Sequence, residues 1–234
     1  SVYLDGLEKY EEELITLDEL NQYIKTIPNQ DEIRISLKIK MYTLYTNTLD
    51  KLGMPQKALE HARLGEKIAV TNHEIDSLFM LWSQIGTIYL KLEELKLAEE
   101  YFFKALDIQP KVEGKHLIPF AFKHFATLLI MKNEWDFAKK IIDQSIDISK
   151  NQPDERNLAE SLTSSAKWCM GQNHYEKAIE LLLQAEKISA MHPNKPQLDD
   201  IIADLCFCYG KINNLKMFQS YSKKFFWLSY NKEK

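Results

Sequence analysis

The sequence predicts an all-α protein built from repeated pairs of helices, and two observations support this fold class. Apolar residues recur three and four positions apart, the spacing of amphipathic helices, and long strand-like alternation is absent. Mostly small residues also recur every 40 positions, as the close packing of paired helices requires. Three such series are Ala58, Ala98, Ala138, Ala178 and Phe218; Gly65, Ala105, Ser145, Ala185 and Phe225; and Thr46, Gly86, Ala126, Ala166 and Cys206.

The stretch 1–30 is predicted to be a degenerate N-terminal repeat or a set of capping helices. Gly6 already stands at the small-residue position, which leaves little room for a full first helix. Two interpretations stay open: the chain begins inside a longer protein, or the stretch is a natural N-terminal cap. The apolar residues form two stripes, one of Leu4, Leu7, Tyr10 and Leu14, the other of Leu17, Leu20, Ile24 and Ile27, which Pro28 closes.

The range 31–234 is predicted to form five repeats of two helices each. Asp31 is placed to cap the first helix, Gly53 to end it and Pro55 to begin the second. Later first helices are expected to begin near Pro119 and after Pro153. The predicted repeats span 31–70, 71–110, 111–150, 151–190 and 191–231.

The last predicted helix runs from Asn214 to about Tyr230 and ends with many aromatic residues. A helical repeat array needs a polar outer face at its end. The aromatic end therefore indicates either packing onto the preceding helix pair or a surface for self-association. The aromatic residues are Tyr221, Phe225, Phe226, Trp227 and Tyr230.

Composition excludes several classes of protein. The net charge of −4 lacks the basic footprint of a nucleic-acid-binding chain, and no apolar run is long enough to span a membrane. Three cysteines are too few for a disulfide framework, so Cys169, Cys206 and Cys208 are expected to be small core residues of a cytoplasmic protein.

Residues that could carry catalysis are scattered. The sequence has no phosphate-binding loop, dinucleotide-binding glycine motif, zinc-protease motif or nucleophile elbow. No two of its six histidines share the i, i+4 spacing of a helical metal site. We therefore expect no enzymatic activity, no cofactor and no metal.

The second repeat carries a recognisable motif. Its order W-x2-I-G-x2-Y, followed by A-x3-F-x2-A-x4-P, resembles the tetratricopeptide repeat (TPR). The resemblance implies a right-handed superhelix of about five to six helix pairs whose first helices line a concave groove. A TPR unit spans about 34 residues, so the period of 40 implies longer helices and loops. The matching residues are Trp82, Ile85, Gly86, Tyr89, Ala98, Phe102, Ala105 and Pro110.

Transferring the groove positions of TPR arrays gives a set rich in amides, hydroxyls and cations. Such groups can pair with the backbone of an extended peptide, and Lys123 and Lys167 could hold a carboxylate. Asn47 is the sharpest candidate, because one amide both donates to and accepts from a peptide unit. The predicted contacts are Asn47, Gln84, Thr87, Lys91, Lys123, His124, Thr127, Thr163, Ser164 and Lys167, and the same offsets reach Thr43, Leu44, Ser83, Ala203, Asp204 and Phe207.

The residues at the clamp positions and the length of the repeat distinguish between classes of TPR protein. The carboxylate clamp of chaperone-binding TPR proteins keeps only Asn47 here, because Thr43, Gln84, Phe120 and His124 occupy its other positions. The 40-residue period is similar to that of the RRNPP group, the Gram-positive peptide receptors that include PlcR, NprR and the Rap proteins. That resemblance implies a short signalling peptide in the groove and, in many members, a homodimer.

The sequence thus predicts a non-catalytic, peptide-sensing TPR domain of a bacterial transcriptional regulator. DNA binding would then belong to an N-terminal domain outside this segment, because the segment has no helix-turn-helix of its own. Two alternatives stay open: a TPR scaffold for protein assembly, and the helical-repeat domain of a larger transcription activator. The expected partner is a short peptide or protein segment, without membrane or direct nucleic-acid contact.

Overall fold

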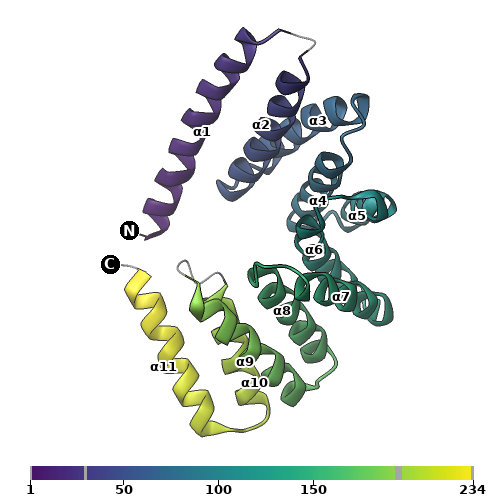
Figure 1. Ribbon diagram of the computed structural model, residues 1–234. Coiled ribbons are helices and arrows are strands. Elements are labelled where there is room, and N and C mark those ends of the chain that lie inside the picture. Colours follow the sequence, from purple (N-terminus) through teal and green to yellow (C-terminus); the bar gives the residue numbers. More distant parts are fainter. Residues whose placement is uncertain (1, 29–30, 193–196, 233–234) are drawn as a thin grey trace. The chain divides into compact units, whose positions relative to one another are not determined.

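A computed structural model describes residues 2–28, 31–192 and 197–232, although the side chains of 2–8 and 229–232 fall outside what it describes (Figure 1). Within these ranges the chain is all-α. Its eleven α-helices are α1 (Val2–Thr26), α2 (Glu32–Lys51), α3 (Pro55–Thr71), α4 (Ile75–Lys91), α5 (Leu95–Ile108), α6 (Ile118–Met131), α7 (Trp135–Lys150), α8 (Arg156–Gly171), α9 (Tyr175–Met191), α10 (Leu198–Lys211) and α11 (Leu215–Lys232). Two short 3-10 helices, η1 (Gln109–Lys111) and η2 (Lys115–Leu117), precede α6.

The helices after α1 form five pairs, and the turns inside these pairs repeat every 40 residues. Each turn contains one residue in the left-handed region, with φ between +55° and +70°. This conformation reverses the chain within three residues and starts the second helix antiparallel to the first. The backbone therefore confirms the 40-residue period. The five residues are Gly53, Glu93, Asn133, Asn173 and Asn213.

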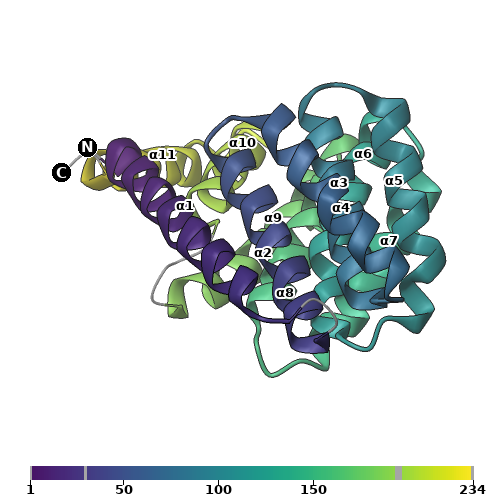
Figure 2. The same cartoon turned by 90° about the horizontal axis from the view of Figure 1, so that it is seen from above.

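The chain divides into two compact units, Ser1–Gly114 and Lys115–Lys234. In the first unit, α2 packs between α1 and α3, and α4 packs between α3 and α5 (Figures 1 and 2). In the second unit, α8 contacts α6, α7 and α9, while α10 contacts α9 and α11. In the second unit, one hydrophobic cluster is formed almost entirely by buried side chains of α8, α9 and α10, such as Leu182 and Leu205. Helices α6 and α7 add further buried apolar residues, such as Phe125 and Ile141.

The small-residue series explain how the helices approach each other. The alanines at 58, 98, 138 and 178 are fully buried, and so are Ala126 and Ala166, or nearly so. A Cβ atom built on Gly86 would lie 2.9 Å from the ring of Phe102, closer than two carbons tolerate. The missing side chain of Gly86 thus makes room for the Phe102 ring between α4 and α5.

Several predicted helix boundaries are confirmed. The carboxylate of Asp31 accepts a hydrogen bond from the backbone N–H of Ile33 at 2.8 Å and caps α2. Pro55 is the first residue of α3, and Pro119 lies in the first turn of α6. None of the helices in the described ranges is long and apolar enough to cross a membrane.

The N-terminal stretch forms one continuous helix, α1, which carries both apolar stripes. No proline interrupts it before Pro28, and Leu14 and Leu17 lie three positions apart, so the two stripes join along one face. Leu17 and Ile24 are buried on that face, against α2. The side chains of Leu4 and Leu7 lie outside the described residues.

Candidate functional site

The first helices of the pairs carry the ten side chains that the sequence predicts as peptide contacts. The structure distributes them over both units, and we describe each group by itself. The unit 1 set is Asn47 on α2 with Gln84, Thr87 and Lys91 on α4. The unit 2 set is Lys123, His124 and Thr127 on α6 with Thr163, Ser164 and Lys167 on α8.

In the unit 1 set, polar side chains connect one first helix to the next. The Gln84 amide donates from Nε2 to the backbone oxygen of Thr43 at 3.3 Å, which joins α4 to α2. Lys91 Nζ lies 2.6 Å from Asp50 Oδ2 and makes a second link between the same helices. These contacts show that the predicted faces of α2 and α4 meet, and they already occupy Gln84 and Lys91.

Asn47 differs from the other members of the unit 1 set. Its side chain is half-buried and makes no hydrogen bond with any described residue. An amide carries two N–H donors and a carbonyl acceptor, all of which seek partners. Asn47 therefore keeps its full hydrogen-bonding capacity for water or for a ligand.

All four hydroxyl groups in the two sets donate a hydrogen bond to the backbone of their own helix. Thr87 donates to the backbone oxygen of Ser83, and Thr163 to that of Ala159, each at 2.8 Å. Ser164 and Thr127 make the same bond four residues back, at 3.1 and 2.9 Å. This i to i−4 bond satisfies a hydroxyl locally, which is how Thr87, Thr163 and Ser164 can be buried.

In the unit 2 set, Glu160 is the point where polar contacts converge. Lys123 Nζ on α6 lies 3.8 Å from Glu160 Oε2 on α8. The amide of Gln197, just before α10, donates to Glu160 Oε1. His124 packs edge-on against Phe120, with their ring centroids 5.1 Å apart. Lys123 thus has a carboxylate partner and His124 an aromatic one.

Lys167 and Asp204 form the least satisfied part of this face. Lys167 is exposed and has no carboxylate within 4.0 Å in the described ranges. Asp204 on α10 has a buried Oδ2 atom without a hydrogen-bond partner there. Burial raises the pKa of the Asp204 carboxyl, Lys167 opposes that shift, and Asp200 adds to it. The groove offset reached Asp204, but its burial depends on packing that no single helix encodes.

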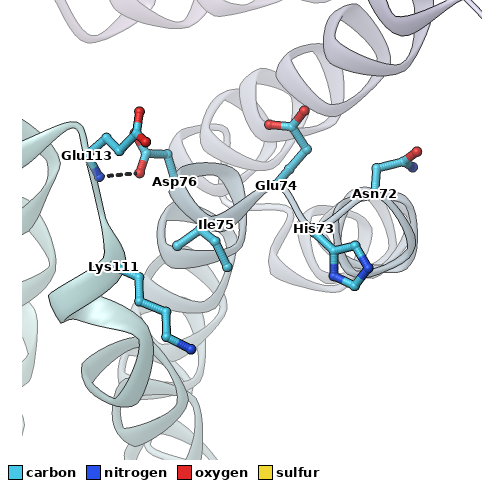
Figure 3. Close-up of a pocket in the computed structure, with 7 residues that line it drawn as sticks. All are labelled: Asn72, His73, Glu74, Ile75, Asp76, Lys111 and Glu113. Carbon is cyan, nitrogen blue, oxygen red and sulfur yellow. Dashed lines mark hydrogen bonds between the residues drawn. The ribbon is translucent and has the colours of Figure 1, made fainter.

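Unit 1 also contains a cleft whose lining residues belong to neither set, and sequence reasoning missed it. A cleft of about 320 Å³ is lined by residues 72–76 at the turn between α3 and α4, together with Lys111 and Glu113 (Figure 3). The Asp76 carboxylate accepts hydrogen bonds from the backbone N–H groups of Glu113 and Gly114, each at 2.9 Å. Asp76 therefore anchors the segment after η1 to α4, with one bond to each of its carboxylate oxygens.

The cysteines contribute to packing, as expected. Cys169 and Cys208 are buried free thiols, and Cys206 is half-buried. Burial raises the pKa of Cys208 to about 12 and also raises that of Cys169, so both stay protonated and unreactive at neutral pH. In the described ranges, no group of three His, Cys, Asp or Glu side chains could hold a metal ion.

Comparison with known proteins identifies one repeat directly. Residues 80–112 match the tetratricopeptide repeat family model, in agreement with the motif around Trp82 and Gly86. No curated protein sequence matches the chain.

Solved structures share the fold at low sequence identity. BtubC (BKLC) from P. vanneervenii superposes with a TM-score of 0.73 at 12% identity, covering 100% of this chain and 93% of that one. A Rap protein complexed with competence and sporulation factor gives 0.74 at 14% identity, covering 97% and 65%. Apo RapI gives 0.62 at 18% identity, covering 94% and 63%. This chain thus has a TPR-like fold and spans slightly less than two thirds of the two Rap chains.

Proposed function

We propose that the chain is a non-catalytic peptide-binding domain that senses a short signalling peptide as part of a bacterial transcriptional regulator. The observation that carries the proposal is that the side chains of Asn47 and Lys167 have no hydrogen-bond or ion-pair partner among the described residues. Each lies on a first helix at a predicted contact position, and neither forms a hydrogen bond or ion pair with the described residues. The neighbouring polar groups Gln84, Lys91 and Lys123 already have partners within the fold.

The chemistry of these two groups suits an extended peptide. The backbone of such a peptide has N–H and C=O groups that no secondary structure satisfies. The Asn47 amide can donate to a peptide C=O and accept from a peptide N–H at the same time. The Lys167 ammonium attracts a carboxylate, either an acidic side chain or the C-terminus of the peptide.

The shared fold adds support of a limited kind. The Rap structure that superposes on 97% of this chain holds a named peptide factor. At 14% identity that likeness concerns the fold, and the peptide belongs to the Rap protein. The proposal for this chain therefore depends on its own Asn47 and Lys167.

A peptide would act by shifting a population of conformations. Repeat arrays transmit contacts only between neighbours, so small changes between repeats accumulate along the array. A peptide that contacts several repeats favours the arrangement to which it binds more tightly. That shift would change how the domain presents itself to the rest of the regulator in the cytoplasm, including a DNA-binding domain outside this segment.

Isothermal titration calorimetry with short peptides from the culture medium of the source organism tests the proposal. We expect one peptide class to bind, and Asn47→Ala to weaken binding about tenfold, because about 1.4 kcal/mol of hydrogen bonding is lost. Lys167→Gln should weaken binding of that peptide and have less effect once its carboxylates are amidated. Lys140→Gln is the matched control. It removes an exposed lysine from α7, which is the second helix of its pair and carries no predicted contact.

Two results would contradict the proposal. One is that no peptide binds, or that Asn47→Ala and the wild type bind equally well. The other is that affinity capture returns one stable protein partner whose binding is indifferent to peptide. That second result would favour the alternative of a TPR scaffold for protein assembly.

A further inference from the structure

The helices α1 and α11 carry opposite charge. Helix α1 contains seven acidic and two basic residues, which gives a charge of −5. Helix α11 contains four lysines and no acidic residue, which gives +4. The net charge of the whole chain is only −4, so the charge per residue of each of these two helices is much larger than that of the chain.

The outward face of α1 combines carboxylates with apolar side chains. Leu17 and Ile24 point into the first unit and are buried. On the other side, Ile15 is 61% and Tyr23 62% exposed. The exposed Glu12 and Glu19 lie on this same side. An exposed apolar pair among carboxylates is unfavourable in water and suits a basic, partly apolar partner.

The outward face of α11 has the complementary character. Tyr221 points inward, where its hydroxyl donates to Glu186 Oε2 at 2.9 Å, and Lys224 pairs with the same carboxylate. Leu215 and Trp227, by contrast, are 68% and 64% exposed. Lys216 and Lys223 are exposed between them. Part of the aromatic end thus packs onto the preceding helices, and part faces away from them.

The charged residues on the two faces have the same spacing. Glu12 and Glu19 are seven positions apart, as are Lys216 and Lys223, which is about 10 Å along a helix. Tyr23 follows Glu19 by four positions, and Trp227 follows Lys223 by four. A parallel alignment of the two helices therefore places each lysine against a glutamate and Trp227 against Tyr23. The sequence difference is 204 positions at all three pairs.

We infer that α11 of one copy of this chain docks on α1 of a second copy. The contact is heterologous, because different surfaces of the two copies meet. A pair joined in this way keeps one free α1 face, on one copy, and one free α11 face, on the other, so association continues beyond a dimer. Matched charges fix the register, and burial of Ile15, Tyr23, Leu215 and Trp227 supplies apolar contact. The inference stands independently of peptide binding.

Sedimentation velocity over a range of chain concentrations is the test. We expect the mean mass of the wild type to rise with concentration and to fall as salt is added. The variant K216E/K223E and the variant E12K/E19K should each remain monomeric, with association weakened by about tenfold or more. Mixing the two variants should restore association, because each then meets a face of opposite charge.

Controls separate this contact from a general effect of charge. K140E/K150E on α7 and E176K/E180K on α9 make the same changes in net charge at exposed positions of other helices, and should associate like the wild type. Circular dichroism confirms that every variant is folded. A wild type that stays monomeric at all concentrations overturns the inference, as does a mixture that fails to associate. Binding of the monomeric chain to anionic phospholipid vesicles through α11 would also overturn it.

Discussion

The pairs α4–α5 and α10–α11 occupy the same positions of the repeat, 120 residues apart, yet they fill the contact between their helices differently. In the first, Gly86 leaves room for the ring of Phe102. In the second, Cys206 and Ser222 take the equivalent positions, and Cys206 Sγ lies 3.1 Å from Ser222 Oγ. The larger side chain has moved from the second helix to the first. The Cys206–Ser222 pair fills less volume than Gly86 and Phe102, so the side chain gained on the first helix replaces only part of the bulk lost from the second.

The repeat position held by Ala98 and Phe218 shows a change in residue size that its neighbours do not accommodate. Ala98 in α5 is fully buried, whereas the equivalent Phe218 in α11 is 38% exposed. A ring at a position built for a methyl group cannot enter the same space, so Phe218 lies at the margin, where a Cβ atom built on Gly210 would lie 3.3 Å from its ring. α10–α11 therefore packs a smaller part of its apolar surface than α4–α5, and we expect it to contribute less to stability.

The largest expected effect comes from removing the two rings. Phe102→Ala should lower the free energy of unfolding by about 3–5 kcal/mol, because it empties a buried site against Gly86. Phe218→Ala should cost about 1 kcal/mol, since its ring is partly in water. Urea denaturation followed by circular dichroism measures both. Equal losses would contradict the idea that the two pairs pack differently.

Replacing the two contact residues of α4–α5 by those of α10–α11 tests the same comparison. Gly86→Cys alone should clash with the Phe102 ring, and Phe102→Ser alone should leave a cavity. The double variant G86C/F102S reproduces the combination found in α10–α11, so it should cost less than the two single losses added together. Additive losses would show that volume exchange across this contact does not operate.

The next effect concerns the equivalent residues Gln84 and Asp204, both of which have a buried oxygen atom without a partner. Gln84 is neutral, whereas the buried Asp204 carboxyl has a raised pKa. A carboxyl whose folded pKa is raised stabilises below its unfolded value and loses that contribution as pH rises through the folded value. Asp204→Asn should therefore raise stability at pH 7, with a gain that vanishes near pH 3.8 and below.

The pH dependence of urea denaturation for Asp204→Asn and the wild type checks this sign. Glu180→Gln removes an exposed carboxylate of α9 and should change stability little at either pH. An Asp204→Asn variant that is less stable than the wild type at pH 7 would indicate that the carboxylate has a partner in solution.

The smallest effect lies in the turns of the two pairs. Glu93 and Asn213 both adopt left-handed conformations, with φ of +61° and +55°. Asparagine tolerates this region better than glutamate. Glu93→Asn should therefore stabilise, and Asn213→Glu should destabilise, each by up to about 1 kcal/mol. Thermal denaturation measures the two changes, and shifts of the same sign in both variants would refute this explanation.

Local signals allowed much of the fold to be predicted. Asp31, Pro55 and Pro119 mark helix starts, because capping and proline geometry depend only on neighbouring residues. The sequence left the form of α1 open, because its two apolar stripes are equally consistent with one capping helix and with the two helices of a degenerate repeat. The continuity of that helix becomes evident only when Leu17 and Ile24 are seen packed on one face against α2.

The candidate site was less predictable from sequence. Ten positions share one offset pattern, but Thr163 and Ser164 are buried and bonded to their own helix, while Asn47 and Lys167 are not. The cleft beside Asp76 had no sequence signal, since its partners Glu113 and Gly114 lie 37 and 38 positions away. Both outcomes depend on which helices become neighbours.

The sequence by itself determined the all-α class, the 40-residue period and the helix boundaries of most repeats. These features follow from backbone preferences and from the periodicity of apolar and small residues, which act over one or two helical turns. Only the tertiary structure decided which polar groups keep their full hydrogen-bonding capacity, as Asn47 does, and which use part of it within the fold, as Gln84 does with the Thr43 carbonyl. The physical reason is that desolvation and hydrogen bonding depend on atoms from other helices, so identical offsets in the repeat acquire different surroundings.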